Sequence, residues 1–140
     1  MQDLVRNINP ALVIMPGRIA EVNPLLASIE DVAIDDIGCF KYILCKVYQD
    51  GSKEDHKMIV RGTKQAEFHA DIYDHLDASL EEIGVTCECV GGGKIEHDSL
   101  AKTITVFGYS QGYGKADHSV TVRLLKEKYP DYNSITWKDN

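Results

Sequence analysis

Residues 56–83, HKMIVRGTKQAEFHADIYDHLDASLEEI, change their hydrophobic pattern partway along. The segment 56–62 is typical of a strand. Gly62 and Thr63 then break the strand, and Thr63 is the expected N-cap of a helix over 64–83. Within that helix, side chains spaced three and four residues apart form one apolar stripe: His69, Ile72, Tyr73, Leu76, Leu80 and Ile83. The stretch therefore predicts a strand followed by an amphipathic helix whose stripe begins with a histidine.

The segments on either side complete the fold prediction. Gly84 is expected to cap the first helix, and a second helix is expected over 116–129, where Pro130 stops it. Aromatic and β-branched residues predict strands at 28–35, 39–49, 56–62, 85–90, 102–110 and 132–137. The order β-β-β-α-β-β-α-β predicts an α/β (α+β) fold: a single compact domain with a mixed, mostly antiparallel sheet of about six strands flanked by two helices.

Length and composition are those of one globular domain. The chain has 140 residues, of which 44% are hydrophobic and 26% charged, which is enough to bury one core. Residues 1–26 contain three of the four prolines and show no sustained hydrophobic period. We therefore expect residues 1–26 to be a mobile or loosely docked extension and residues 27–140 to form the domain.

The charge and the cysteines restrict the partners and the compartment. A formal charge of -7 disfavours nucleic acid and anionic membranes as partners, because both would repel the chain. No apolar run approaches the roughly 18 residues of a membrane-spanning helix. Cys39, Cys45, Cys87 and Cys89 lack the Cys-x-x-Cys spacing and are expected to be reduced thiols. The sequence therefore predicts a cytoplasmic protein, and nothing in it demands more than a monomer.

His69 is the first candidate for chemistry. A single histidine on an apolar stripe is often a core residue whose ring nitrogens are satisfied. His69, however, is expected near the start of a helix, where the helix dipole attracts anions and favours a neutral imidazole. A neutral histidine beside an anion can act as a base or as a nucleophile.

Basic residues and glycine-rich segments could supply the anion site. Lys41, Arg61 and Lys94 stand near the ends of expected elements, although each alone could be a solvated surface charge. The segments 91–94 (GGGK) and 108–114 (GYSQGYG) are expected turns whose backbone N–H groups could hold a phosphate. A plain hairpin turn is the alternative for GGGK.

A metal site is not expected. Asp71 and His75 are spaced as i and i+4, but they lie off the apolar stripe on the solvent face of the predicted helix. His56, His97 and His118 are scattered through predicted loops and element ends. No multi-ligand spacing appears, so we expect neither a metal nor another cofactor.

Several motifs together resemble the small phosphohistidine phosphatase (Janus) family. They are FKYIL at 40–44, IVRG at 59–62, AEFHADIYD at 66–74, CECVGGGKIEH at 87–97, YSQGYGKADH at 109–118 and KYPDY at 128–132. The resemblance runs from about residue 27 to residue 137 in matching order. The segment 109–118 looks most similar to the Janus-A-like members.

The resemblance implies a protein histidine phosphatase that hydrolyses phosphohistidine on protein substrates without a metal, and phospholysine is a further candidate substrate. It implies that His69 is the general base. It also implies a substrate-binding role for Lys41, Arg61 and Lys94 and for the main chain of Tyr109, Ser110, Gln111 and Gly112. The chain departs from its relatives in two places. Lys94 stands where many relatives have an arginine, which removes a bidentate fork, and Gln111-Gly112 stands where some have Met-Ala.

The residues leave alternative mechanisms and alternative functions open. A covalent phospho-His69 intermediate needs the same neutral imidazole as a general base does. A non-catalytic phosphate or phosphopeptide-binding module would use the same basic residues and N–H groups. A structural interaction domain with a core histidine would bind no phosphate. A cysteine-based phosphatase is disfavoured, because Cys89 is followed by VGGGK and not by a phosphate-cradling loop that ends in arginine.

Overall fold

The computed structural model describes residues 12–15, 18–21 and 23–139 and divides the chain into two compact units, 1–30 and 31–140. In the first unit, strand β1 (Leu12–Met15) pairs antiparallel with β2 (Arg18–Glu21). A short helix α1 (Pro24–Ala27) follows, and the Asn23 side chain caps it. None of these elements was expected from the sequence. The expected mobility of residues 1–26 falls partly outside the described residues and stays a prediction, as does the domain boundary after residue 26.

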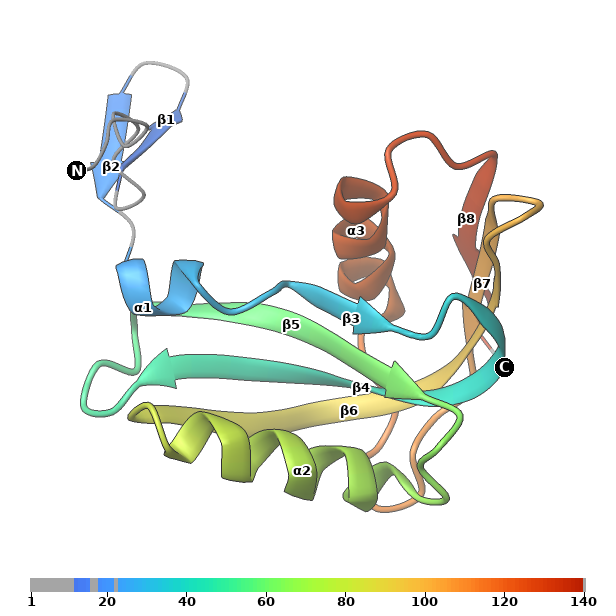
Figure 1. The fold of residues 1–140 in the computed structure, drawn as a ribbon, viewed down its shortest axis with the longest axis horizontal. Coiled ribbons are helices and arrows are strands. Elements are labelled where there is room, and N and C mark those ends of the chain that lie inside the picture. Colours follow the sequence, from blue (N-terminus) through green and yellow to red (C-terminus); the bar gives the residue numbers. More distant parts are fainter. Residues whose placement is uncertain (1–11, 16–17, 22, 140) are drawn as a thin grey trace. The chain divides into compact units, whose positions relative to one another are not determined.

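The second unit is built on one six-stranded sheet with the order β3-β5-β4-β6-β7-β8 (Figure 1). The strands are β3 (Val32–Ile34), β4 (Ile37–Gln49), β5 (His56–Thr63), β6 (Val85–Asp98), β7 (Thr103–Phe107) and β8 (Ser134–Trp137). Both edge strands pair in parallel, and the three inner pairings are antiparallel. The predicted mixed, mostly antiparallel sheet is therefore confirmed.

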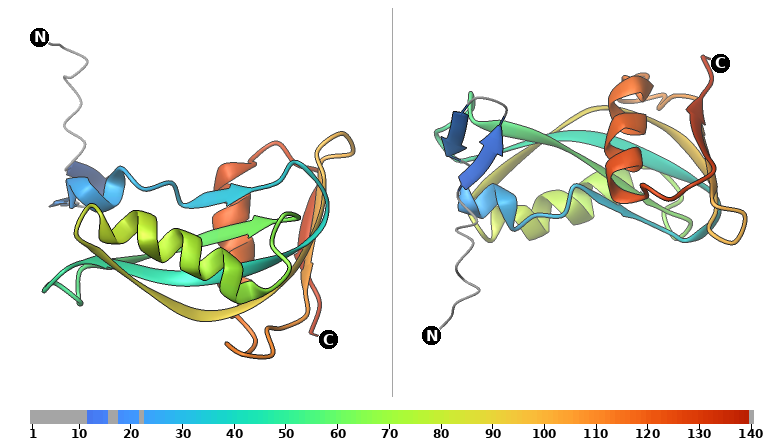
Figure 2. Two further views of the ribbon diagram at one scale, coloured as in Figure 1. Left: turned by 60° about the horizontal axis from the view of Figure 1, so that its bottom comes forward. Right: turned by 90° about the horizontal axis from the view of Figure 1, so that it is seen from above.

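Two helices cover opposite faces of this sheet (Figures 1 and 2). Helix α2 (His69–Glu81) connects β5 to β6, and α3 (His118–Lys128) connects β7 to β8. Side chains alternate along β4, so Phe40, Tyr42 and Leu44 join the core under α3. The intervening Ile43, Cys45 and Val47 are buried on the other face, which α2 covers. Among the described residues, no helix has the length and apolar character needed to cross a membrane.

Helix α2 begins later than the sequence indicated. Thr63 is not the N-cap, because it pairs with Lys41 as the last residue of β5. Its hydroxyl accepts a hydrogen bond from the N–H of Gln65 at 3.1 Å, which turns the chain away from the sheet. The N-cap is Phe68, whose N–H donates to the Asp71 carboxylate at 2.9 Å. His69 is therefore the first residue of the helix and does not lie in its second turn.

The GGGK segment is not a turn. Gly91, Gly92 and Gly93 continue β6 opposite Leu44, Ile43 and Tyr42, after an extra residue, Val90, that makes a β-bulge. These positions are glycines because there is no room for a side chain. A Cβ would lie 2.6 Å from the Ala116 Cα at Gly91, 2.8 Å from the His69 ring at Gly92 and 2.7 Å from the His118 ring at Gly93. The three glycines let both helix starts approach the strand closely.

Candidate active site

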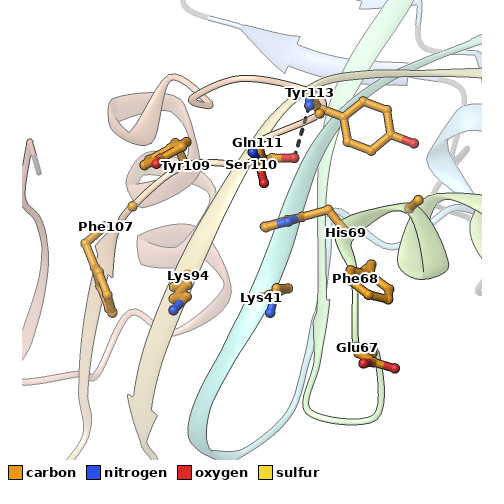
Figure 3. A pocket seen from close by; sticks show the side chains of 13 residues that line it. Lys41, Glu67, Phe68, His69, Lys94, Phe107, Tyr109, Ser110, Gln111 and Tyr113 are labelled. Atoms are coloured by element: carbon orange, nitrogen blue, oxygen red, sulfur yellow. Dashed lines mark hydrogen bonds between the residues drawn. The ribbon is translucent and has the colours of Figure 1, made fainter.

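One cavity of about 1070 Å³ lies where the start of α2, the sheet and the turn after β7 meet (Figure 3). It is lined by Lys41, Glu67, Phe68, His69, Ala70, Lys94, Phe107, Gly108, Tyr109, Ser110, Gln111, Gly112 and Tyr113. The cavity is open to solvent, so a group attached to another molecule can enter it.

The floor of the cavity is a row of side chains across three strands. Lys41 on β4 pairs with Lys94 on β6, which pairs with Phe107 on β7. Adjacent strands lie about 4.8 Å apart, and paired residues point to the same face, so the two lysines share the cavity. Within the described part of the chain, neither ammonium group has an ion-pair partner. The row therefore offers an anion two positive charges that are not engaged in a described ion pair.

The hydrogen bond of His69 determines which of its nitrogens can react. Its ring is buried, and Nε2 lies 2.9 Å from the carbonyl oxygen of Gly93. A carbonyl oxygen can only accept, so Nε2 carries the proton and donates it. In the neutral ring, the lone pair is then on Nδ1. Figure 3 shows the imidazole between Lys41 and the turn at Ser110 and Gln111.

The surroundings of His69 keep it neutral. Burial lowers the pKa of the imidazole below its usual value, and the positive charges of Lys41 and Lys94 lower it further, while the hydrogen bond to Gly93 opposes them. A basic nitrogen is therefore available at neutral pH. An arriving phosphoryl group would offset the charge of the two lysines.

The turn after β7 presents backbone donors to the same cavity. Ser110 is buried, its N–H donates to the carbonyl of Gly114 at 3.1 Å, and its hydroxyl accepts from the N–H of Tyr113 at 3.1 Å. These bonds fix the turn. The N–H groups of Gln111 and Gly112 have no acceptor among the described residues. Successive free N–H groups in a turn form an anion-binding nest.

His118 supports this turn from the other face of the sheet. It is the first residue of α3 and is buried. Its Nε2 donates to the carbonyl of Gly108 at 2.8 Å, and its Nδ1 is 2.7 Å from the hydroxyl of Tyr42. Gly108 has a φ of 75° and begins the turn. The sequence analysis placed His118 at an element end but assigned it no function.

The structure brings together every predicted site residue except Arg61. Lys41, His69, Lys94, Tyr109, Ser110, Gln111 and Gly112 all line the cavity. Arg61 lies on β5 opposite Ile43, and its guanidinium donates to the carbonyl of Val60 at 2.9 Å. It is not among the lining residues.

Sequence reasoning provided no grounds to expect four other lining residues, namely Glu67, Phe68, Ala70 and Phe107, and it pointed to Gly108 and Tyr113 only as parts of the 108–114 turn. Only the pairing register of β6 and β7 could have placed Phe107 beside Lys94. No group of three or more metal-ligating side chains occurs in the described part of the chain.

Comparisons with known proteins show which family the chain belongs to. The sequence model of the Janus/Ocnus family matches residues 26–133. The 14 kDa phosphohistidine phosphatase of Sus scrofa is 50% identical over 119 residues, which cover 82% of this chain and 94% of that protein. The human protein of the same name is 46% identical with the same coverage. Sex-regulated protein janus-A of Drosophila yakuba is 46% identical over 111 residues, 79% of this chain and 81% of that protein. The chain thus belongs to the Janus/Ocnus family, as its motifs indicated.

Proposed function

We propose that this protein is a protein histidine phosphatase that hydrolyses phosphohistidine. The observation that carries the proposal is the neutral His69, whose basic Nδ1 shares a cavity with Lys41 and Lys94 and with the turn at Gln111 and Gly112. Among the described residues, these two ammonium groups have no ion-pair partner and these two backbone N–H groups have no acceptor. The names of the porcine and human relatives support the same activity. The open cavity suits a phosphorylated side chain on another protein.

In the proposed reaction the phosphoryl group is positioned before it is attacked. The N–H groups of Gln111 and Gly112 and the ammonium groups of Lys41 and Lys94 hold its oxygens. Nδ1 of His69 takes a proton from a water molecule, whose oxygen forms a bond to phosphorus as the P–N bond breaks. The leaving imidazole of the substrate keeps the electron pair of that bond and takes up a proton from solvent, and His69 later releases its own added proton to solvent. The products are phosphate and histidine.

A covalent route uses the same atom. Nδ1 of His69 would attack phosphorus directly, and water would then hydrolyse phospho-His69. In both routes the attacking atom and the leaving nitrogen lie on opposite sides of phosphorus. The proposed role of Nδ1 does not depend on which route operates.

We propose that the reaction needs no metal. The two ammonium groups and the N–H groups of the turn carry the charge stabilisation that Mg²⁺ provides in other phosphoryl transfers. Phosphate contacts are proposed for Lys41, Lys94, Gln111 and Gly112. The phosphate contacts expected of Arg61 and of the main chain of Tyr109 and Ser110 stay predictions. Cytoplasmic location, a monomeric state and activity on phospholysine are parts of the same proposal.

Release of inorganic phosphate from a phosphohistidine peptide tests the proposal. We expect wild-type protein to release phosphate at the same rate with and without EDTA. Loss of activity in EDTA would contradict metal independence. The rival function, a phosphate-binding module, predicts that phosphate raises the melting temperature while no phosphate is released from the peptide. That pair of results would overturn the enzyme assignment.

A further inference from the structure

Aromatic side chains surround the cavity on two sides. Phe68 and Tyr109 are 59% and 63% exposed, and Phe107 and Tyr113 are partly buried. Among the described residues, Trp137 is the only other large aromatic side chain that is exposed. Phe68, Phe107, Tyr109 and Tyr113 all line the same cavity. The proposed chemistry of phosphate and His69 does not use these aromatic rings.

The ring of Tyr109 contributes little to the stability of the fold, because most of it is exposed to solvent. Its neighbour Ser110 is buried and holds the turn through its own hydrogen bonds. The hydroxyl of Tyr109 makes no hydrogen bond to another described residue. An exposed aromatic ring of this kind is more useful as a contact surface for a ligand, because aromatic rings provide large contact areas at low cost in side-chain entropy.

The geometry of phosphoryl transfer indicates which aromatic side chains face which part of the substrate. Attack starts from the side of His69, so the leaving nitrogen lies on the far side of phosphorus. Phe68 directly precedes His69 and shares its side of the cavity. Phe107 lies beyond Lys94 in the floor, and Figure 3 shows Phe107 and Tyr109 across the cavity from His69. The leaving group therefore arrives at Tyr109 and Phe107.

We propose that Tyr109, backed by Phe107, is a specificity-determining wall that contacts the imidazole ring of the departing histidine. The inference rests on the proposed function and narrows its substrate class. A planar imidazole stacks on an aromatic ring, and it gains a cation–π contact once it is protonated. The amino group that leaves phospholysine and the ammonia that leaves phosphoramidate have no ring to stack. The wall therefore favours phosphohistidine over other N-phosphoryl compounds.

The test compares two small substrates, free phosphohistidine and phosphoramidate, so that only the leaving group differs. The measured quantity is the ratio of their kcat/KM values. We expect Tyr109→Ala to lower this ratio by about 3- to 10-fold, the size of a typical aromatic contact. Tyr109→Phe should keep the ratio within about 2-fold, because it retains the ring. Phe68→Ala is the matched control: it removes an equally exposed ring from the attacking side and should not lower the ratio.

The other outcomes overturn the inference in distinguishable ways. If Tyr109→Ala slows both substrates by the same factor, the ring does not contact the imidazole, although the phosphatase function stands. If Phe68→Ala lowers the ratio and Tyr109→Ala does not, the leaving group lies on the other side. If wild-type protein hydrolyses neither substrate, the proposed function fails and the inference fails with it.

Discussion

The reactive atom of the proposed site is Nδ1 of His69. The carbonyl of Gly93 fixes the tautomer by accepting from Nε2. Burial lowers the pKa of the ring, and Lys41 and Lys94 lower it further. Because the folded protein favours the neutral imidazole, kcat/KM should rise with pH through a midpoint below the usual histidine value and then level off.

Replacing Lys41 tests this electrostatic account. Lys41→Met keeps an aliphatic stem but removes a positive charge, so the pKa of His69 should rise and the acid limb of kcat/KM should move to higher pH. Loss of a charged phosphate contact should also lower kcat/KM about tenfold. An NMR titration of the imidazole in the free protein measures the pKa directly.

Lys126→Met is the control for that titration, because Lys126 is exposed on α3, on the opposite face of the sheet. It should leave the pKa of His69 unchanged. A pKa that stays the same or falls in Lys41→Met would contradict the proposed influence of the lysine.

Strand β6 is the element on which the site depends. Its glycines allow α2 to bring His69 against one face and α3 to bring His118 against the other. The imidazole of His69 then reaches a carbonyl of the strand, and the ring of His118 reaches the carbonyl of Gly108 at the start of the turn after β7. The β-bulge at Val90 lies immediately before this close approach.

A single methyl group on β6 should therefore disturb both stability and activity. In Gly92→Ala, the Cβ would lie 2.7 Å from the Tyr42 carbonyl and 2.8 Å from the His69 ring. We expect a loss of about 1–3 kcal/mol in the free energy of unfolding, as for other overpacked sites, and at least tenfold slower phosphate release. Urea unfolding and the peptide assay measure the two effects.

Gly112→Ala is the matched control for stability. A Cβ at Gly112 meets nothing within 4 Å. This substitution should change the free energy of unfolding by less than about 0.5 kcal/mol, as is usual at exposed positions. Equal stability of the Gly92→Ala and Gly112→Ala proteins would show that the close packing of His69 on β6 is unimportant.

The whole domain assembles a site from segments that are far apart in the sequence. Lys41, His69, Lys94 and Ser110 come from β4, the start of α2, β6 and the turn after β7. The sheet supplies the floor, and the α2 helix start and the turn after β7 supply the walls (Figure 3). Such a site is held in place by the packing of the domain, which is what pre-organised catalysis of phosphoryl transfer requires.

The order of the domain's elements could be predicted because hydrophobic period separates helices from strands in most of the chain. The motifs that carry the family resemblance also pointed to His69 and to the turn after β7, and both line one cavity. Local patterns failed where long-range packing decides the structure. Thr63 resembles an N-cap but pairs in the sheet, and the glycines of GGGK resemble a turn but make room for two histidines. Strand register, which places Phe107 beside Lys94, leaves no local signal.

The most direct test of the account is phosphate release from a phosphohistidine peptide by wild-type, His69→Ala and His75→Ala proteins at pH 7. His75 is an exposed histidine on the same helix and serves as the matched control. We predict at least a 100-fold lower kcat/KM for His69→Ala, the usual contribution of a general base, in a protein whose circular dichroism is unchanged. His75→Ala should stay within about twofold of wild type, as expected of a surface residue outside the site. A folded His69→Ala protein with wild-type activity would contradict the account.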